Sequence, residues 1–461
     1  MSYRPAFHFT AKKNWINDPN GLVFLDGEYH LFFQHNPSAN TPGNIGWGHA
    51  VSSDLLHWTE LEMALPFQNS IMAFSGSVVV DTQNSSGFGT DALIALFTAH
   101  HTTKSLEAQH LAHSTDHGRT WQLYAGNPVL DIGQADFRDP KVFWHKPSQR
   151  WVMLVVLPFE RIVQFYTSSN LKNWLFSSQF GSAGSVEGIW EVPDLFELLL
   201  DGVAYWVLKV DVGSGGLFGG SGGQYFIGQF DGQCFVTESL ETNWLDFGKD
   251  FYAALSFNNL GSRRVWLAWM NNWQYAALTP TAPWRGAMSL PRELSLWRDS
   301  RGLRLRQLPI AELEQRRVAL YSETNVVVQN QHLPLAIRGQ HLEIMAEFTV
   351  QDAPEFGLKV CVGANSQTTI GYQTATQEVF VDRRQTGDFC DLFAGRYTAR
   401  LEQTKLRLHI FIDSCSLEVF VQHGEVVFTT LIFPEHGADA LELYALGGRV
   451  ELSQLSIWTL L

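Results

Sequence analysis

The chain has 461 residues and a formal net charge of -14 at pH 7, with 45% hydrophobic and 17% charged residues. Its length favours one large domain with a smaller second one, and its acidity argues against a nucleic-acid or acidic-lipid partner, because both require a basic surface. No segment has the roughly 20 consecutive apolar residues that span a bilayer, so no membrane partner is expected.

The start of the chain and its cysteines indicate the compartment. Residues 1–5 lead directly into polar sequence without the apolar stretch of a secretory signal, which predicts a cytoplasmic location unless a leader was removed. The cysteines lie far apart and form no C-x-x-C pair, which favours free thiols over a zinc site or a disulfide framework. They are Cys234, Cys361, Cys390 and Cys415.

A recurring phrase in the first half predicts a repeated structural unit. A short apolar run leads to Ser or Thr with Asp or Asn, and then to a Trp, at Trp58, Trp121 and Trp174, which are 63 and 53 residues apart. This spacing, with alternating strands and Gly, Asn and Asp turns, is typical of a β-propeller, whose blades bury their faces against one another. Residues 1–308 are therefore predicted to form five blades of roughly 60 residues each.

The second half predicts a separate β-domain. Residues 309–324 are expected to be a helical linker, because they begin with a run of good helix formers that contains neither Gly nor Pro after Pro309. Alternating strands separated by polar turns return in residues 325–461, and a β-sandwich is the simplest arrangement for them. The expected fold is all-β, with a five-bladed β-propeller followed by a C-terminal β-sandwich.

Three carboxyl groups stand in unusual local surroundings. Asp18 lies in W-I-N-D-P-N-G, which by itself is only a good turn. Asp139 lies in F-R-D-P, where Arg138 can hold a carboxylate ionised, although such a pair before Pro is also an ordinary strand end. Glu191 lies in I-W-E-V-P-D-L-F, whose apolar groups raise a carboxyl pKa toward that of a general acid, although an exposed edge-strand Glu also fits. On three blades of one propeller, these acids can meet at the axis.

Four motifs carry a family resemblance. In chain order they are W-I-N-D-P-N-G (15–21), F-S-G-S (74–77), F-R-D-P (137–140) and W-E-V-P-D-L-F (190–196). Together they resemble glycoside hydrolase family 32. The resemblance continues through W-M-N-N-W-Q-Y and P-W-R-G-A-M-S-L-P-R-E-L, which look most like exo-inulinases, levanases and related invertases, and into the C-terminal S-L-E-V-F-V.

The resemblance implies retaining hydrolysis of terminal non-reducing β-D-fructofuranoside residues in sucrose or in fructans such as inulin and levan. It implies Asp18 as nucleophile, Glu191 as acid/base and Asp139 as a stabiliser that contacts the fructosyl hydroxyls. Two carboxyl groups about 5–5.5 Å apart can supply the anion and the acid that this chemistry needs. By the same resemblance, the fructose pocket is lined by Trp15, Asn17, Gln34, Phe74, Ser75, Arg138 and Trp284.

Two positions depart from the family pattern. Pro42 stands before Gly-Asn where the family usually has Trp, so one wall of the sugar pocket is expected to differ. Val192 follows Glu191 where the family commonly has Cys, which removes a weakly hydrogen-bonding, polarizable neighbour of the acid/base.

Two other functions share this scaffold. A fructosyltransferase would pass the fructosyl unit to a sugar instead of water, and a carbohydrate-binding protein would show no turnover, which retention of all three carboxyl groups argues against. No metal and no cofactor are expected, because the histidines lack the spacing of a metal site and the chemistry requires none. The expected partner is a small fructoside or oligosaccharide, and the oligomeric state is left open.

Overall fold

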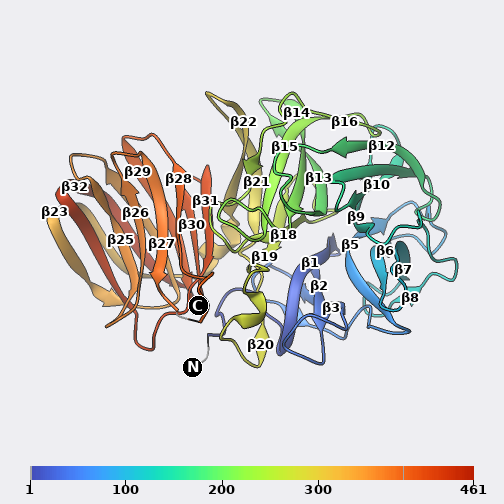
Figure 1. Ribbon diagram of the computed structural model, residues 1–461, viewed down its shortest axis with the longest axis horizontal. Coiled ribbons are helices and arrows are strands. Elements are labelled where there is room, and N and C mark those ends of the chain that lie inside the picture. The colour runs from blue at the N-terminus through green and yellow to red at the C-terminus, as the bar shows by residue number, and fades with distance from the viewer. Residues whose placement is uncertain (1–2, 388, 461) are drawn as a thin grey trace.

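The computed structural model describes residues 3–387 and 389–460. It shows two β-domains side by side, a propeller built from the first two thirds of the chain and a sandwich built from the last third (Figure 1). The predicted all-β class, with a five-bladed propeller followed by a sandwich, is confirmed. No helix in the described part of the chain is long and apolar enough to cross a membrane.

Each propeller blade is an antiparallel sheet, and its strands follow one another along the chain. The first blade contains β1 (Asn14–Leu25), β2 (Glu28–Asn36), β3 (Gly46–Ser52) and β4 (Thr59–Glu60). The second contains β5 (Ile71–Asp81), β6 (Ala92–His101), β7 (Glu107–Ser114) and β8 (Gln122–Leu123). The third contains β9 (Arg138–His145), β10 (Arg150–Leu157), β11 (Ile162–Ser168) and β12 (Leu175–Gly181).

The last two blades carry additions. The fourth contains β13 (Trp190–Leu200), β14 (Val203–Val212), β15 (Gly222–Phe230) and β16 (Phe235–Val236), with β17 (Asn243–Trp244) paired to β15. The fifth contains β18 (Tyr252–Ser256), β19 (Val265–Trp269), β21 (Arg292–Asp299) and β22 (Gly302–Pro309). Between β19 and β21 come the 3-10 helix η1 (Ala276–Leu278) and β20 (Trp284–Arg285), which pairs in parallel with β1.

The first strands of the five blades contact one another in a ring: β1 with β5, then β9, β13 and β18, and β18 again with β1. Hydrogen bonds close the ring between the last blade and the first, since Asn258 N–H donates to the Leu22 carbonyl at 2.8 Å and Phe24 N–H donates to the Asn258 carbonyl at 3.1 Å. The strands nearest the axis therefore come from five distant parts of the sequence.

The recurring Trp phrase marks one corner of three blades. Trp58, Trp121 and Trp174 each follow the third strand of their blade, and each indole N–H donates to a carbonyl three residues earlier at 3.0–3.1 Å. The Ser that begins the corner also bonds the Asp or Asn two residues later, as Ser52 does with Asp54. The period seen in the sequence is thus the period of the blades.

The sandwich is one folded-over sheet in which β32 (Ala440–Leu460) joins the two layers by pairing with β23 (Arg317–Arg338), β24 (Leu342–Thr349) and β25 (Glu355–Val362). On one side follow β29 (Lys405–Asp413), β30 (Ser416–Val421) and β31 (Val426–Leu431). On the other follow β26 (Gln367–Gln373), β27 (Glu378–Gln385) and β28 (Arg396–Arg400). Alternate side chains of both layers enter one apolar core.

The segment between the domains is mostly strand. Of the helical linker predicted for residues 309–324, only η2 (Ala311–Arg316) is helical, and it is a 3-10 helix. Strand β23 begins at Arg317, because the residues from there onward pair with β32. The run of good helix formers therefore forms only a short 3-10 helix, and the rest of the expected linker is strand. Pairing with the long strand β32 overrides the weak local propensity.

Buried charges join the two domains. Arg292 of β21 donates to Glu418 of β30 at 2.5 Å and to Asp246 at 3.1 Å, and it is completely buried. His8 bonds Asp413 at 2.8 Å and Glu418 at 2.9 Å. Burial opposes a charged ring there, but these two carboxylates outweigh it and raise the pKa of His8 to about 9. Buried groups paired this completely fix how the two domains sit against each other.

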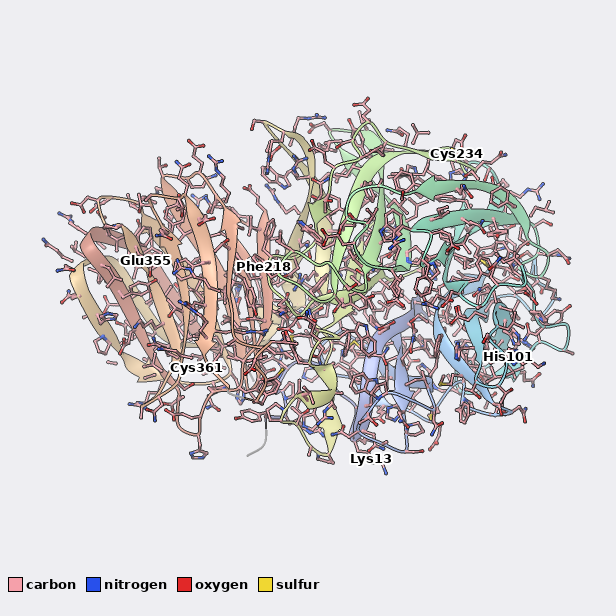
Figure 2. All side chains as sticks on the ribbon, viewed as in Figure 1. Lys13, His101, Phe218, Cys234, Glu355 and Cys361 are labelled. Carbon is pink, nitrogen blue, oxygen red and sulfur yellow. The ribbon has the colours of Figure 1, made fainter. Side chains whose placement is uncertain are left out.

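Phe218, which Figure 2 labels near the boundary between the domains, makes a second contact between them. This residue lies in the glycine-rich loop between β14 and β15, and its ring packs on Tyr397 of β28 with centroids 5.2 Å apart. The same figure labels Cys234 and Cys361, two of the four cysteines, all of which are free thiols.

Arg292→Met tests the charged seam. The substitution keeps the buried stem but leaves Glu418 and Asp246 without this cation, so we expect the free energy of unfolding to fall by about 3–5 kcal/mol, measured by urea denaturation. The control is Arg301→Met, which removes an arginine whose side chain is 74% exposed, and its effect should stay below about 0.5 kcal/mol. Equal effects of the two substitutions would contradict a structural role for the seam.

Candidate functional site

The three predicted carboxyl groups come from near the starts of three first strands. Asp18 lies on β1, Asp139 on β9 and Glu191 on β13. Asp18 and Asp139 are each 6% exposed, and the Glu191 side chain is 20% exposed. Because these strands surround one axis, residues far apart in the sequence form one acidic group at one end of the propeller.

Asp18 is held by donors from its own blade and the next. Ser75 Oγ donates to Oδ2 at 2.7 Å, Asn17 Nδ2 donates to Oδ1 at 3.0 Å, and Gln34 Nε2 reaches Oδ2 at 3.5 Å. Gln34 also donates to Ser75. Donors on both oxygens stabilise the ionised carboxylate and fix its orientation.

Trp15 supports this arrangement from behind. Its indole Nε1 donates to Asn17 Oδ1 at 2.7 Å, and the residue is fully buried. Its ring stacks on Trp273, with centroids 5.9 Å apart, and packs against Trp269 at 5.8 Å. Trp273 is 39% exposed, so this ring, and not Trp15, forms the outer surface of the aromatic wall.

A strained backbone positions Asp139 and Glu191. Asp139 has a φ of 65° and Val192 a φ of 46°, both in the left-handed region that a β-branched residue rarely enters. Such a conformation costs about 1–3 kcal/mol and persists only where its surroundings enforce it. Here Val192 N–H donates to Asp139 Oδ2 at 2.9 Å, and a bulge interrupts the β13–β14 pairing between Glu191 and Asp194. Asp139 is thereby locked to the turn that aims Glu191.

Glu191 receives one donor on each oxygen. Arg138 Nε donates to Oε1 at 3.2 Å, and the Tyr252 hydroxyl of β18 donates to Oε2 at 2.5 Å. Arg138 is itself fixed by Glu107, whose Oε2 accepts from its terminal nitrogen at 2.8 Å. The carboxyl group is therefore oriented by three blades at once.

Burial raises the pKa of Asp18, Asp139 and Glu191 above ordinary carboxyl values. For Asp18, hydrogen bonds such as that from Ser75 act in the opposite direction, and for Glu191 the Arg138 guanidinium does so. For Asp139, the neighbouring charge of Glu191 adds to burial, so its pKa lies well above the usual range. Interacting acids titrate as a set, and their raised pKa values favour the protonated form that a general acid requires.

Not every predicted site residue joins this group. Phe74 lies at its margin, where its ring stacks on His100 with centroids 4.5 Å apart. Trp284 lies on β20, opposite Asn14 of β1, with the Arg4 guanidinium 5.3 Å from its ring and in the same buried apolar cluster as Phe393 of the sandwich domain. Among the described residues, no hydrogen bond joins Trp284 to the three carboxyl groups.

The site contains four further residues that were not predicted from the sequence. Tyr252 and Glu107 bond Glu191 and Arg138 from other blades, and neither stands in a distinctive motif. Lys209 and Asp211 form a buried ion pair on β14. Two charges in the otherwise apolar run V-L-K-V-D-V are a signal that the sequence did contain.

Two family descriptions match consecutive parts of the chain. "Glycosyl hydrolases family 32 N-terminal domain" covers residues 8–309, and "Glycosyl hydrolases family 32 C terminal" covers residues 310–459. The chain belongs to glycosyl hydrolase family 32. Among its relatives, the levanase of Bacillus subtilis is 46% identical over 99% of this chain and 70% of the levanase. The extracellular exo-inulinase of Aspergillus niger is 39% identical, over 97% of this chain and 93% of the inulinase.

Solved structures agree with this family 32 assignment. The exo-inulinase from Aspergillus awamori superposes with a TM-score of 0.97 at 37% identity, covering 100% of this chain and 99% of that one. The β-fructofuranosidase from Schwanniomyces occidentalis, complexed with fructosyl-erythritol, superposes with a TM-score of 0.92 at 31% identity, covering 99% of this chain and 97% of that one.

Among the described residues of this glycoside hydrolase, no cluster of three or more His, Cys, Asp or Glu side chains could hold a metal ion.

Proposed function

We propose that this family 32 enzyme hydrolyses terminal non-reducing β-D-fructofuranoside residues of sucrose and fructans, releasing fructose with retention of configuration. The observation that carries the proposal is the meeting of Asp18, Asp139 and Glu191 in one largely buried group, with Ser75 and Arg138 bonded to it. The relatives named levanase, exo-inulinase and β-fructofuranosidase support the substrate class.

In the first step, a carboxylate oxygen of Asp18 attacks the anomeric carbon of the fructosyl unit. Glu191 donates its proton to the glycosidic oxygen, the bond from that oxygen to the anomeric carbon breaks, and the aglycone leaves as an alcohol. The two donors from Ser75 and Asn17 aim Asp18. The product of this step is a covalent fructosyl ester of Asp18.

In the second step, Glu191, now a carboxylate, removes a proton from water that enters where the aglycone left. The resulting hydroxide equivalent attacks the anomeric carbon and breaks the ester bond, which restores the Asp18 carboxylate and the protonated Glu191. The hydrogen bonds from Arg138 and Tyr252 suit this step, because they stabilise the ionised form of Glu191.

Asp139 serves a third role in this proposal. Its carboxylate cannot move freely, since Val192 N–H holds Oδ2, and it lies beside both other acids. We assign it to the fructosyl hydroxyls, whose hydrogen bonds strengthen as positive charge develops on the ring. Asn17, Gln34 and Ser75 reach the same space from the first two blades, with Trp15 behind them.

Product analysis tests the proposed function. The purified enzyme is incubated separately with sucrose, inulin and levan, and the products are resolved by chromatography over time. We expect free fructose as the main early product, because an exo-enzyme removes one chain-end unit per event. Early oligosaccharides without fructose would indicate an endo-enzyme, longer fructosides from sucrose would indicate a transferase, and no product from any substrate would overturn the proposal.

The assigned roles predict the effect of isosteric substitutions. Asp18→Asn and Glu191→Gln should each fold normally and lower kcat by roughly 10⁴–10⁶-fold, because the nucleophile and the acid/base act as a unit. Glu187→Gln, four residues before Glu191 and exposed, should retain wild-type turnover. Near wild-type activity on sucrose in either active-site variant would refute its assignment.

Stereochemistry tests the two-step mechanism itself. Two successive inversions at the anomeric carbon release β-fructofuranose, which mutarotation then scrambles. Proton NMR within the first minutes after a large dose of enzyme should therefore show the β-furanose anomer first. Initial appearance of the α anomer would mean a single displacement by water and would remove the nucleophile role from Asp18.

A further inference from the structure

The mechanism above leaves one buried ion pair at the site unused. Lys209 and Asp211 lie on β14, and because they are two residues apart their side chains share one face of the strand. The Lys209 ammonium donates to Asp211 Oδ2, and both residues have no exposed surface. A buried pair of this kind is costly to desolvate, so its presence among apolar neighbours is not explained by stability alone.

Lys209 forms a hydrogen bond to the strained turn that follows the acid/base. Its ammonium donates to the Val192 carbonyl at 2.9 Å. The other side of the same residue is held by Asp139, which accepts from Val192 N–H at 2.9 Å. Val192 is thus clamped at both of its backbone polar groups in a left-handed conformation with a φ of 46°. Glu191 precedes it directly, so release of one clamp frees the backbone that aims the acid/base.

Asp211 is the cross-strand partner of Glu191 in the β13–β14 ladder. It interacts electrostatically with Asp18 of β1, Glu191 of β13 and Tyr252 of β18, while Lys209 acts on Asp18 and on Lys141 of β9. Asp211 Oδ1 has no hydrogen-bond partner among the described residues. Burial, together with the charges of Asp18 and Glu191, raises the pKa of Asp211 to about 7 against the opposing effect of Lys209.

We propose that Lys209 and Asp211 are positioning residues that hold Glu191 in place and set the pH range in which the site is active. This inference rests on the proposed function. Lys209 supplies the positive charge that favours ionised Asp18, whereas Asp211, once it ionises near pH 7, disfavours loss of the proton from Glu191. The pair thereby acts on the nucleophile and on the acid in opposite senses.

The two charges can be removed separately with little change in shape. Asp211→Asn removes the negative charge that Asp211 carries above about pH 7, so in that range Glu191 loses its proton more easily and the alkaline limb of the kcat/KM profile moves to lower pH, by roughly one unit. Lys209→Met removes a positive charge beside Asp18, so Asp18 ionises less easily and the acid limb moves to higher pH. Lys209→Met also frees the Val192 carbonyl, and a displaced acid/base lowers kcat by about 10–100-fold more than it changes KM.

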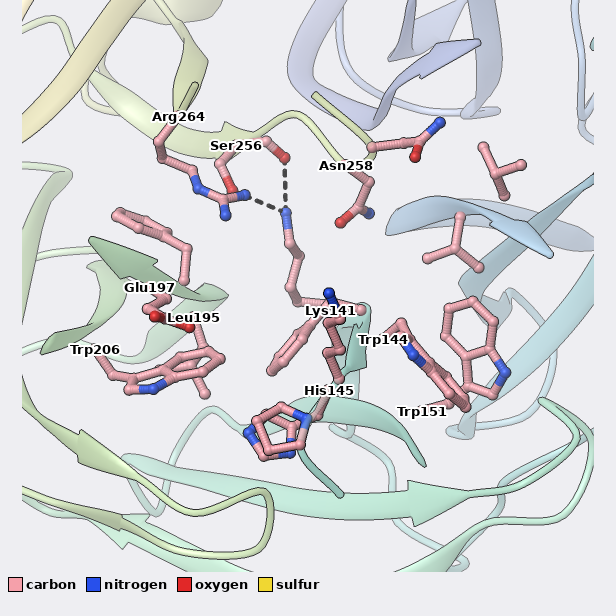
Figure 3. Close-up of a pocket in the computed structure, with 17 residues that line it drawn as sticks. Lys141, Trp144, His145, Trp151, Leu195, Glu197, Trp206, Ser256, Asn258 and Arg264 are labelled. Atoms are coloured by element: carbon pink, nitrogen blue, oxygen red, sulfur yellow. Dashed lines mark hydrogen bonds between the residues drawn. The ribbon is translucent and has the colours of Figure 1, made fainter. Parts of the chain in front are cut away.

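A second buried lysine, on another of the first strands, provides the control. Lys141 of β9 pairs with Asp194 at 3.1 Å and donates to the Ser256 carbonyl at 2.7 Å. Figure 3 shows its ammonium pointing toward Ser256 in a cavity of about 290 Å³ lined by the later parts of the first strands. Lys141→Met removes a similarly buried cation whose partners are Asp194 and Ser256, and not Val192 or Glu191, so it should destabilise the protein without moving either limb.

The experiment measures kcat and KM from pH 4 to 9 on the fructoside that the wild type cleaves best. It compares the wild type with Lys209→Met, Asp211→Asn and Lys141→Met, and circular dichroism confirms that each variant is folded. Asp211→Ser removes the same charge and replaces Asp211→Asn where that variant does not fold. We expect an acid-limb shift upward in the first variant, an alkaline-limb shift downward in the second and no shift in the third.

Each result separates the alternatives. Lower activity with unmoved limbs in both the Lys209 and Asp211 variants would mean that the pair is only structural and would overturn the inference. Equal shifts in Lys141→Met would overturn it as well, because the effect would then not depend on the pair. A wild type inactive on every fructoside would overturn the proposed function and this inference with it, whereas an active wild type with limbs shared by all variants would overturn only the inference.

Discussion

Closure of the five-bladed ring is the constraint on which the rest of the molecule depends. A single blade cannot bury both faces of its sheet, so each packs against its neighbours and the last must meet the first. Here Asn258 makes that closure with Leu22 and Phe24, and β20 adds a parallel contact to β1. Once the ring is closed, the first strands surround one axis, and polar side chains near the starts of these strands lie close together at one end of it.

That shared space concentrates negative charge out of water, which is unfavourable unless cations and donors accompany it. Arg138 and Lys209 supply the cations, and Ser75, Asn17 and Tyr252 supply donors to individual carboxyl oxygens. The local backbone is also strained, at Asp139 and Val192. Charge burial and strain at one place are what a site pre-organised for chemistry displays, and the surrounding propeller provides the stability that offsets them.

Among the residues that the structure describes, the sandwich contributes no carboxyl group to this site, yet it is firmly attached to the catalytic domain. Arg292 and His8 join it through Glu418 and Asp413 without exposure to solvent. The loop carrying Phe218 leaves β14 just after Asp211 and reaches Tyr397 of the sandwich. The strand that carries the Lys209–Asp211 pair is therefore continuous with a loop that contacts the sandwich domain.

Local patterns in the sequence were enough to predict the β-propeller and the sandwich, because turn residues, strand alternation and the repeated Trp corner are local and recur at the period of the blades. The three carboxyl groups were predicted from the family resemblance of four motifs in order, because each motif alone also fits an ordinary turn or strand. The contacts of these groups depend on the tertiary structure, which brings Tyr252 to Glu191 and Lys209 to the Val192 carbonyl, and which makes strand of most of the expected linker. Contacts between blades and pairing with β32 join residues far apart in the chain, and no local pattern encodes such distances.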